Sequence, residues 1–318
     1  MPRFDDYVPA GVIPATLLAF DDEFAIDEQA TRDHLRDVAE IDGISAIAVN
    51  AHASEVHACT FDEQHRVLDL TMEEVGDFLP VINGIYADGS HEAARIARMA
   101  EIGGASCLLV LPPHSIFMMG GQMRPEMSLA HFKTIADATD LPIIVFQYPA
   151  TYAYPMDTLL RMIDEVPTIR AIKDWSPPMR HEQNIRSLQS LGRPVNVLST
   201  NSSWLMSSLA MGCNGLLSGA GSVIADLQVA LFEAVRDNNL DHARSINDRI
   251  YPVAQSFYTE PFGDMHNRMK EALVILGRQK RAVVRPPLVK LSKEEIEGIA
   301  QALADAQITR DGALLEAA

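Results

Sequence analysis

The sequence predicts an α/β protein, a (β/α)8 (TIM) barrel of parallel strands with a helical appendage at its C-terminal end. Short apolar runs alternate with amphipathic segments at intervals of about 25 to 30 residues. About eight such units precede the last part of the 318-residue chain, which favours a closed barrel over an open sheet. No GxGxxG motif follows the first apolar run, so the usual reason to expect a dinucleotide-binding fold is missing.

Each predicted strand is a short apolar run, as expected for strands buried on both faces of a parallel sheet. In chain order these runs cover 12–20, 44–50, 79–86, 106–111, 141–148, 168–173, 194–199 and 214–218. The predicted helices between them have apolar residues at helical spacing. They cover 27–41, 61–70, 90–102, a segment from 128 onward after a long loop, 156–163, 181–191, 203–211 and 224–236.

The last part of the chain has helical patterns only. Predicted helices cover 241–257, 264–276 and 292–304, and an extended linker at 283–288 is stiffened by its prolines. We therefore divide the chain into a barrel, residues 1–238, and a C-terminal helical segment, residues 239–318, packed on the barrel.

Composition and charge argue against several classes of partner. A formal net charge of -17 repels nucleic acid and anionic membrane surfaces. No apolar run approaches the length that crosses a bilayer, and the first residues lack the apolar stretch of a secretory signal. Cys59, Cys107 and Cys213 are an odd number of widely scattered cysteines without a CxxC spacing, which favours reduced thiols. We expect a cytoplasmic protein with no nucleic-acid or membrane partner.

The segment 168–176, TIRAIKDWS, ends an apolar run at Lys173. In a parallel barrel the chemistry lies at the carboxyl ends of the strands, where Lys173 would stand. Burial lowers the pKa of a lysine, and an uncharged amine attacks carbonyl carbons. The alternative is a lysine that ends a strand and extends to water. The eightfold pattern around Lys173 favours the functional interpretation.

Several motifs then occur in a fixed order along the chain. They lie at 11–15, 55, 60–63, 141–144, 149, 171–174, 212–218, 270–273 and 285–288. Through them the chain resembles the dihydrodipicolinate synthase / N-acetylneuraminate lyase family from about Gly11 to Leu303. The resemblance implies that Lys173 forms an imine with a 2-oxo acid such as pyruvate, an electron sink for aldol chemistry or dehydration. It also implies a homo-oligomer, a tetramer, and neither a metal nor an external cofactor.

The chain departs from this family after the second strand. The family usually reads Gly-Thr-Thr-Gly-Glu there, whereas residues 51–55 read AHASE. We expect backbone N–H groups of His52, Ala53 and Ser54 to bind the substrate carboxylate, assisted by the Ser54 hydroxyl or the His52 ring. The alternative for His52 is a loop histidine without function.

A second departure lies at the end of the fifth strand. Most family members read Tyr-Asn-x-Pro there, whereas residues 146–149 read FQYP, which places Phe146 where the tyrosine stands. Phenylalanine cannot transfer protons, but Tyr148 would project from the same face two residues later. Tyr148 and His52 are therefore the predicted proton-transfer groups, and His57 and His114 are further candidates. Alternatively, Phe146 packs against an apolar substrate and water transfers the proton.

A third departure concerns the distal part of the substrate. The synthases proper carry an arginine shortly after the proline, whereas residues 150–153 read ATYA. Without this bidentate carboxylate partner, we do not expect a true dihydrodipicolinate synthase. Apolar side chains near the site would suit an aryl or alkyl 2-oxo acid: Met118, Met119, Phe146 and Trp175. The two methionines alternatively belong to the core or to a subunit contact.

Leu217 and Ser218, at the end of the eighth strand, complete the predicted substrate-binding residues. The adjoining segment 218–222, SGAGS, resembles a phosphate cradle for pyridoxal phosphate, although a tight turn is the simpler interpretation of so short a glycine run. No metal site is predicted, because His52 and His57 flank Glu55 without a helix that would aim them together. The sequence thus predicts a Schiff-base carbon lyase, an aldolase or a dehydratase. The alternatives are a catalytically silent 2-oxo acid binding protein and dihydrodipicolinate synthase proper.

Overall fold

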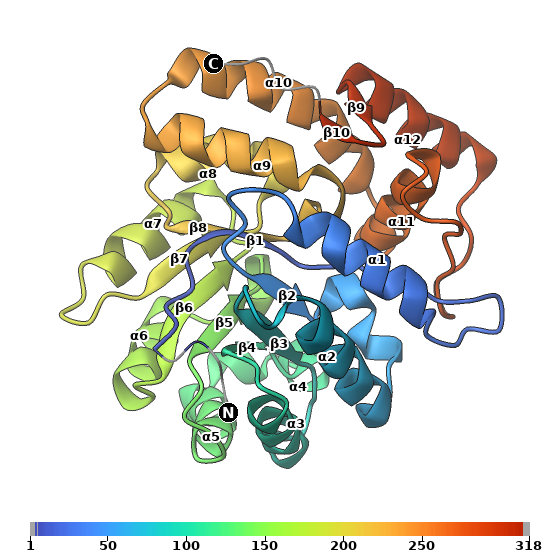
Figure 1. Ribbon diagram of the computed structural model, residues 1–318. Helices are drawn as coiled ribbons and strands as arrows, with labels where there is room; N and C mark the ends of the chain where they lie inside the picture. The colour runs from blue at the N-terminus through green and yellow to red at the C-terminus, as the bar shows by residue number, and fades with distance from the viewer. Residues whose placement is uncertain (1–3, 5, 314–318) are drawn as a thin grey trace.

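The computed structural model, which describes residue 4 and residues 6–313, confirms the predicted barrel (Figure 1). Its eight-stranded parallel sheet, counted over those residues, has the order β1-β8-β7-β6-β5-β4-β3-β2. The strands are β1 (Gly11–Pro14), β2 (Ile47–Val49), β3 (Val81–Ile85), β4 (Cys107–Val110), β5 (Ile143–Gln147), β6 (Ile169–Asp174), β7 (Asn196–Ser199) and β8 (Gly215–Ser218). Backbone hydrogen bonds from Ser45 to Val12 (2.9 Å) and from Thr16 to Ala48 (3.0 Å) close the barrel between β1 and β2.

Helices form the outer layer. They are α1 (Glu28–Ala39), α2 (Phe61–Val75), α3 (Ser90–Ile102), α4 (His114–Met118), α5 (Pro125–Ala136), α6 (Met156–Glu165), α7 (Pro178–Gln189), α8 (Leu205–Ala210) and α9 (Gly221–Arg236). Local sequence explains where some of them begin. The Thr60 hydroxyl accepts the Glu63 N–H, and the Glu63 carboxylate accepts the Thr60 N–H, so a capping box starts α2. The long loop predicted before residue 128 contains α4 and the short 3-10 turn η3 (Gly121–Met123).

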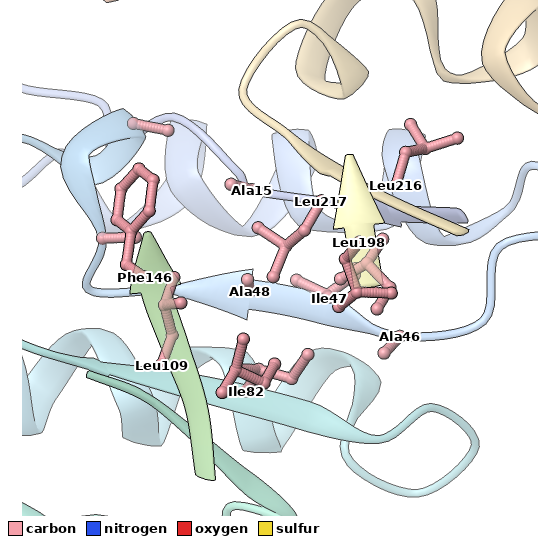
Figure 2. Packing of buried hydrophobic residues seen from close by; sticks show 14 of the residues in the cluster. Ala15, Ala46, Ile47, Ala48, Ile82, Leu109, Phe146, Leu198, Leu216 and Leu217 are labelled. Carbon is pink, nitrogen blue, oxygen red and sulfur yellow. The ribbon is translucent and has the colours of Figure 1, made fainter. Parts of the chain in front are cut away.

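The barrel interior is filled by apolar side chains from the strands (Figure 2). Ile47, Ile82 and Leu198 have no exposed surface. The first strand, Gly11–Pro14, is shorter than the apolar run 12–20 predicts, although backbone hydrogen bonds from Ala15 to Ser218 and from Thr16 to Ala48 continue beyond it. Among the described residues, no helix combines the length and apolar character that crossing a bilayer requires.

The C-terminal segment packs on the barrel through α10 (Leu240–Phe257), which contacts α9 and α12 (Lys293–Asp305) (Figure 1). The turn η6 (Phe262–Asp264) and α11 (Met265–Ile275) follow α10. The prediction that this segment is helical throughout is wrong, because β9 (Ile308–Thr309) and β10 (Gly312–Ala313) form a small hairpin. Strands of two residues are too short to give a sequence pattern. Residues 314–318 of the predicted segment lie outside the described residues.

Glu55 fastens this segment to the barrel. Its buried carboxylate pairs with the Lys270 ammonium of α11 and accepts the Arg285 N–H at 3.0 Å. The Arg285 guanidinium pairs in turn with Glu63 in the first turn of α2. Burying a charge is costly unless it is paired, so these contacts fix the tail against the face where β2 ends. Glu55, one of the motif residues, therefore serves the structure.

Candidate active site

Lys173 lies near the carboxyl end of β6, one residue before the strand ends. It is in register with Phe146 on β5 and with Leu198 on β7, and only 5% of it is exposed. Its Nζ atom lies 4.3 Å from the centre of the Phe146 ring. Burial in these surroundings lowers the pKa of Lys173 to about 7. A large fraction of the amine is therefore uncharged and nucleophilic at neutral pH.

The residue after the lysine anchors the end of the strand. Asp174 is fully buried, and its carboxylate accepts hydrogen bonds from His181 Nδ1 and Asn184 Nδ2, both at 2.8 Å, and from the Ser176 N–H at 3.0 Å. Burial opposes the charged imidazolium, yet the hydrogen bond to Asp174 raises the pKa of His181 to about 9. This ion pair holds β6 against α7 and fixes the strand end that carries Lys173.

Tyr148 and His52, the predicted proton-transfer groups, lie in contact. The Tyr148 hydroxyl is 2.7 Å from His52 Nε2 and 2.8 Å from His114 Nε2. A phenol has a single proton, so it donates to one imidazole while it accepts from the other. The Tyr148 ring stacks on Phe146 with centroids 4.5 Å apart, which confirms that both side chains project from the same face. The structure thus links the two predicted groups and adds His114 to them.

Burial keeps all three of these groups neutral. It raises the pKa of Tyr148 well above 10.0, and it lowers the pKa of His114. The pKa of His52 falls well below 6.5 because of burial and the nearby Lys173 charge. Neutral imidazoles and a neutral phenol pass a proton by exchanging tautomers, so no separated charge is needed inside the protein.

The turn η1 (His52–Ser54) holds His52 over the barrel. Asn50 enters this turn in the left-handed conformation (φ 52°), and its Nδ2 donates to Gln64 O and Asn83 Oδ1, both at 2.8 Å. Gly84 is required beneath it, because a Cβ there would lie 1.9 Å from the Asn50 carbonyl oxygen. Asn50 after β2, together with residues on β3 and α2, therefore sets the position of the turn that carries His52.

Of the donors predicted to bind the substrate carboxylate, those of Ser54 already form hydrogen bonds within the protein. The Ser54 N–H donates to Ala51 O at 3.1 Å, and its hydroxyl donates to Thr16 O at 2.9 Å. The expectation that Ser54 offers these donors to a substrate is therefore not met in this structure, because the turn uses both. The N–H groups of His52 and Ala53 begin the turn, where no intrahelical acceptor exists.

Leu217 and Ser218 occupy different environments at the end of β8. Leu217 has no exposed surface and points into the barrel interior, on the same side as Ala48 (Figure 2). The Ser218 hydroxyl lies 2.9 Å from Ser202 Oγ and 3.3 Å from the hydroxyl of Tyr258, a residue of the C-terminal segment. Leu217 is thus core packing beneath the site, while Ser218 belongs to a hydroxyl cluster at its edge.

The C-terminal segment supplies a further site residue that sequence reasoning missed. His266 of α11 lies over the turn after β8, where a Cβ on Gly219 would stand 2.9 Å from its Nε2. Burial and the Lys173 charge lower the pKa of His266 to about 3. A Cβ on Gly221 would stand 3.0 Å from Pro14, so close packing accounts for the glycine run of 218–222. Nothing in the sequence of the C-terminal segment predicted that His266 would lie over the turn after β8.

Other predicted groups also have definite places. The ring centroids of Trp175 and Tyr148 lie 6.3 Å apart, so Trp175 lies next to the Phe146–Tyr148 ring stack. Met118 and Met119 are 71% and 74% exposed, which rules out the core placement for them. His57 is exposed. Over residues 4 and 6–313, no group of three or more His, Cys, Asp or Glu side chains is arranged to hold a metal ion.

Comparisons with known proteins show which family the chain belongs to. Residues 8–306 match the Dihydrodipicolinate synthetase family. The chain belongs to this family. A DapA-like lyase of Halobacterium salinarum, itself uncharacterised, is 27% identical over 304 residues, which cover 93% of each chain. The 4-hydroxy-tetrahydrodipicolinate synthase of Kineococcus radiotolerans is 28% identical over 269 residues, which cover 82% of each chain.

Solved structures of dihydrodipicolinate synthetase family members share the fold. YagE, a prophage protein of E. coli K12 solved with pyruvate, superposes with a TM-score of 0.85 at 20% identity, covering 94% of this chain and 98% of its own. The synthase of Aquifex aeolicus gives 0.81 at 24% identity, covering 93% and 97%. Members of this family are lyases that form Schiff bases, so the predicted class of enzyme is confirmed.

Proposed function

We propose that this protein is a carbon lyase, an aldolase or a dehydratase, that acts on a 2-oxo acid of the pyruvate type through an imine at Lys173. The observation that supports this most strongly is the lysine itself. It is buried, its pKa is lowered to about 7, and it stands at the carboxyl end of a barrel strand. YagE, whose structure is similar to that of this chain, was solved in complex with pyruvate.

In the proposed reaction the uncharged Lys173 amine attacks the ketone carbon, water leaves, and a C=N bond forms. The protonated imine accepts electrons from the adjacent carbon when that carbon loses a proton or a bonded group. The substrate carboxylate binds the N–H groups at the start of η1, from His52 and Ala53. Phe146 packs against the imine, since its ring already lies 4.3 Å from Nζ.

Proton transfer to and from the carbon next to the imine falls to Tyr148 and His52. They are the polar side chains joined by a 2.7 Å hydrogen bond beside Phe146, which stands where the family's tyrosine is usual. General acid–base catalysis by such groups contributes about 10²- to 10⁴-fold to the rate. The neutral state of both groups suits either direction of transfer.

The protein is proposed not to be a true dihydrodipicolinate synthase, because residues 150–153 contain no arginine. The assembly is proposed to be a homotetramer, by resemblance to the family.

Trapping with borohydride tests the proposed function. Reduction in the presence of pyruvate should add the reduced pyruvyl group to the peptide that contains Lys173, and not to Lys133 or Lys270. A Lys173→Met variant should show no adduct. Loss of the pyruvate methyl signal in D2O, followed by proton NMR, should accompany trapping, because an enamine exchanges these protons with solvent. Trapping without exchange would indicate a silent binding protein, and an adduct elsewhere would refute the site.

A further inference from the structure

The loops after β4 and β5 enclose a pocket of about 390 Å³ beside Tyr148. The two strands are neighbours in the barrel, with Val110 opposite Val145, so the pocket opens at the face that carries Lys173. Its apolar wall consists of Pro112, Phe117, Met118 and Tyr152, and its other described lining residues are His114, Ser115 and Tyr148. Such a volume suits a small organic group.

Three polar residues that line this pocket, His114, Ser115 and Tyr148, form hydrogen bonds within the protein. The Tyr148 hydroxyl and His114 Nε2 are hydrogen-bonded to each other at 2.8 Å. The Ser115 hydroxyl donates to the Asp88 carboxylate, which also accepts the Ser115 N–H at 3.1 Å. A hydroxylated ligand tail would therefore replace few of its bonds to water here, with the Tyr152 hydroxyl as the remaining partner among these lining residues.

Charge also selects against an anionic tail. No lysine or arginine is among the described residues that line the pocket. The carboxylate of Asp88 stands at its rim, where it interacts with His114. An entering carboxylate or phosphate would meet a like charge and no cation.

The pocket adjoins the reactive lysine through two stacked rings. Tyr148 lines the pocket and stacks on Phe146 at 4.5 Å, and Phe146 covers the Lys173 ammonium at 4.3 Å. To reach the pocket, an acid bound as an imine at Lys173 would have to extend its distal carbons past these two rings.

We propose that this pocket binds the apolar distal group, an aryl or alkyl substituent, of the 2-oxo acid on which the enzyme acts. This inference rests on the proposed function, because it places the acid at Lys173. It makes the loops after β4 and β5 the determinant of substrate class.

Reductive trapping of matched acids tests the inference, because trapping depends on imine formation and not on the bond that breaks afterwards. Pyruvate serves as the reference, and 2-oxo-4-phenylbutanoate is compared with 2-oxoglutarate, which carries a carboxylate in the distal position. The half-saturating concentration for trapping should be at least about tenfold lower for the phenyl acid, the effect expected for burying a ring. Equal values, or a preference for 2-oxoglutarate, would overturn the inference.

Two arginine variants test whether the preference for the phenyl acid arises in this pocket. Met118 lines the pocket and Met123 does not, yet they are 71% and 70% exposed, so neither substitution disturbs the core. Met118→Arg should reduce the preference for the phenyl acid by about fivefold or more, because it offers a cation to the carboxylate. Met123→Arg should leave the preference unchanged.

The outcomes separate the two proposals. If pyruvate is not trapped, the proposed function fails and the inference fails with it. If pyruvate is trapped but the phenyl acid has no advantage, the inference alone fails. Sedimentation velocity on both variants gives the remaining outcome. If both arginines change the oligomeric state and the preference alike, these methionines are subunit contacts and the pocket assignment is wrong.

Discussion

At the scale of single residues, the site depends on what burial does to ionisable groups. Lys173 has no carboxylate partner among the described residues that would hold it charged, so burial lowers its pKa to about 7. Its neighbour Asp174 faces the other way and keeps a charge-assisted contact with His181 at 2.8 Å. Adjacent residues on one strand thus differ in role: Asp174 anchors the strand to α7, and Lys173 is the proposed nucleophile.

The pKa of Lys173 sets the pH dependence of its first reaction. Because the protonated amine is inert, the rate of imine formation with pyruvate should fall about tenfold per pH unit below pH 7 and level off above it. Stopped-flow measurement of imine formation in a single turnover gives this profile. A rate that keeps rising toward pH 10.5, the ordinary lysine pKa, would contradict the role of burial.

Tyr148 should control proton transfer without controlling imine formation. Tyr148→Phe removes the hydroxyl between His52 and His114 and should slow exchange of the pyruvate methyl protons by about 10²-fold or more. Borohydride trapping should persist in the same variant. His57→Asn, a change at an exposed histidine nearby, is the matched control and should exchange at the normal rate. Unchanged exchange in Tyr148→Phe would assign the proton to water.

At the scale of elements, the carboxyl ends of strands from distant parts of the chain are locked together by buried polar contacts. Glu55 follows β2 and is paired with Lys270 of α11, 215 residues later. The Gln147 side chain at the end of β5 bonds the Tyr154 backbone in both directions at 2.9 Å. These contacts hold the loops that carry His52 and Tyr148, because a buried polar group without its partner is costly.

Removing one partner of the Glu55–Lys270 pair should therefore be strongly destabilising. Lys270→Met leaves a buried carboxylate and should lower the free energy of unfolding by about 3–5 kcal/mol. The double variant Glu55→Gln with Lys270→Met should lose less than the single one, because no charge remains. Urea denaturation followed by circular dichroism measures both. Arg186→Ala, which breaks an exposed pair with Glu182, should change little.

At the scale of the whole molecule, the C-terminal segment is part of the enzyme's architecture. Helix α10 covers α9, whose Leu227 and Leu231 have no exposed surface. The same segment places Tyr258 beside Ser218 and His266 over the turn after β8. The division at residue 238 separates two patterns in the sequence, and we propose that it does not separate two independently stable units.

Truncation after residue 238 tests this view. Removing α10 to α12 uncovers apolar residues of α9 and leaves Glu55 without Lys270, so the remaining barrel should aggregate or lose cooperative unfolding. Size-exclusion chromatography and thermal denaturation show the result. A monodisperse truncated protein that still forms an imine would mean that the barrel is self-sufficient.

The proposed tetramer is a separate matter of assembly. Sedimentation velocity on the full-length protein should give a species of four chains of 34.9 kDa each. A monomer at micromolar concentration would show that this member of the family does without the assembly.

The sequence by itself determined the barrel and the approximate positions of its helices, and it pointed to Lys173 as the proposed nucleophile. The predicted helix 90–102 coincides with α3. The strand predicted over 168–173 begins and ends one residue later, at Ile169 and Asp174. These features follow from local periodicity, because a buried strand must be apolar and a covering helix must be apolar on one face. The period of two also placed Tyr148 on the same face as Phe146.

Only the tertiary structure decided which polar groups lie together near Lys173. His52, Tyr148 and His114 come from three different loops, and the distances of 2.7 and 2.8 Å between them depend on how those loops pack. Ser54 has a suitable side chain, yet its turn uses both of its donors internally. His266 arrives from a helix whose pattern indicates nothing beyond packing. Contacts between distant segments leave no periodic trace in the chain, because each depends on the position of both partners.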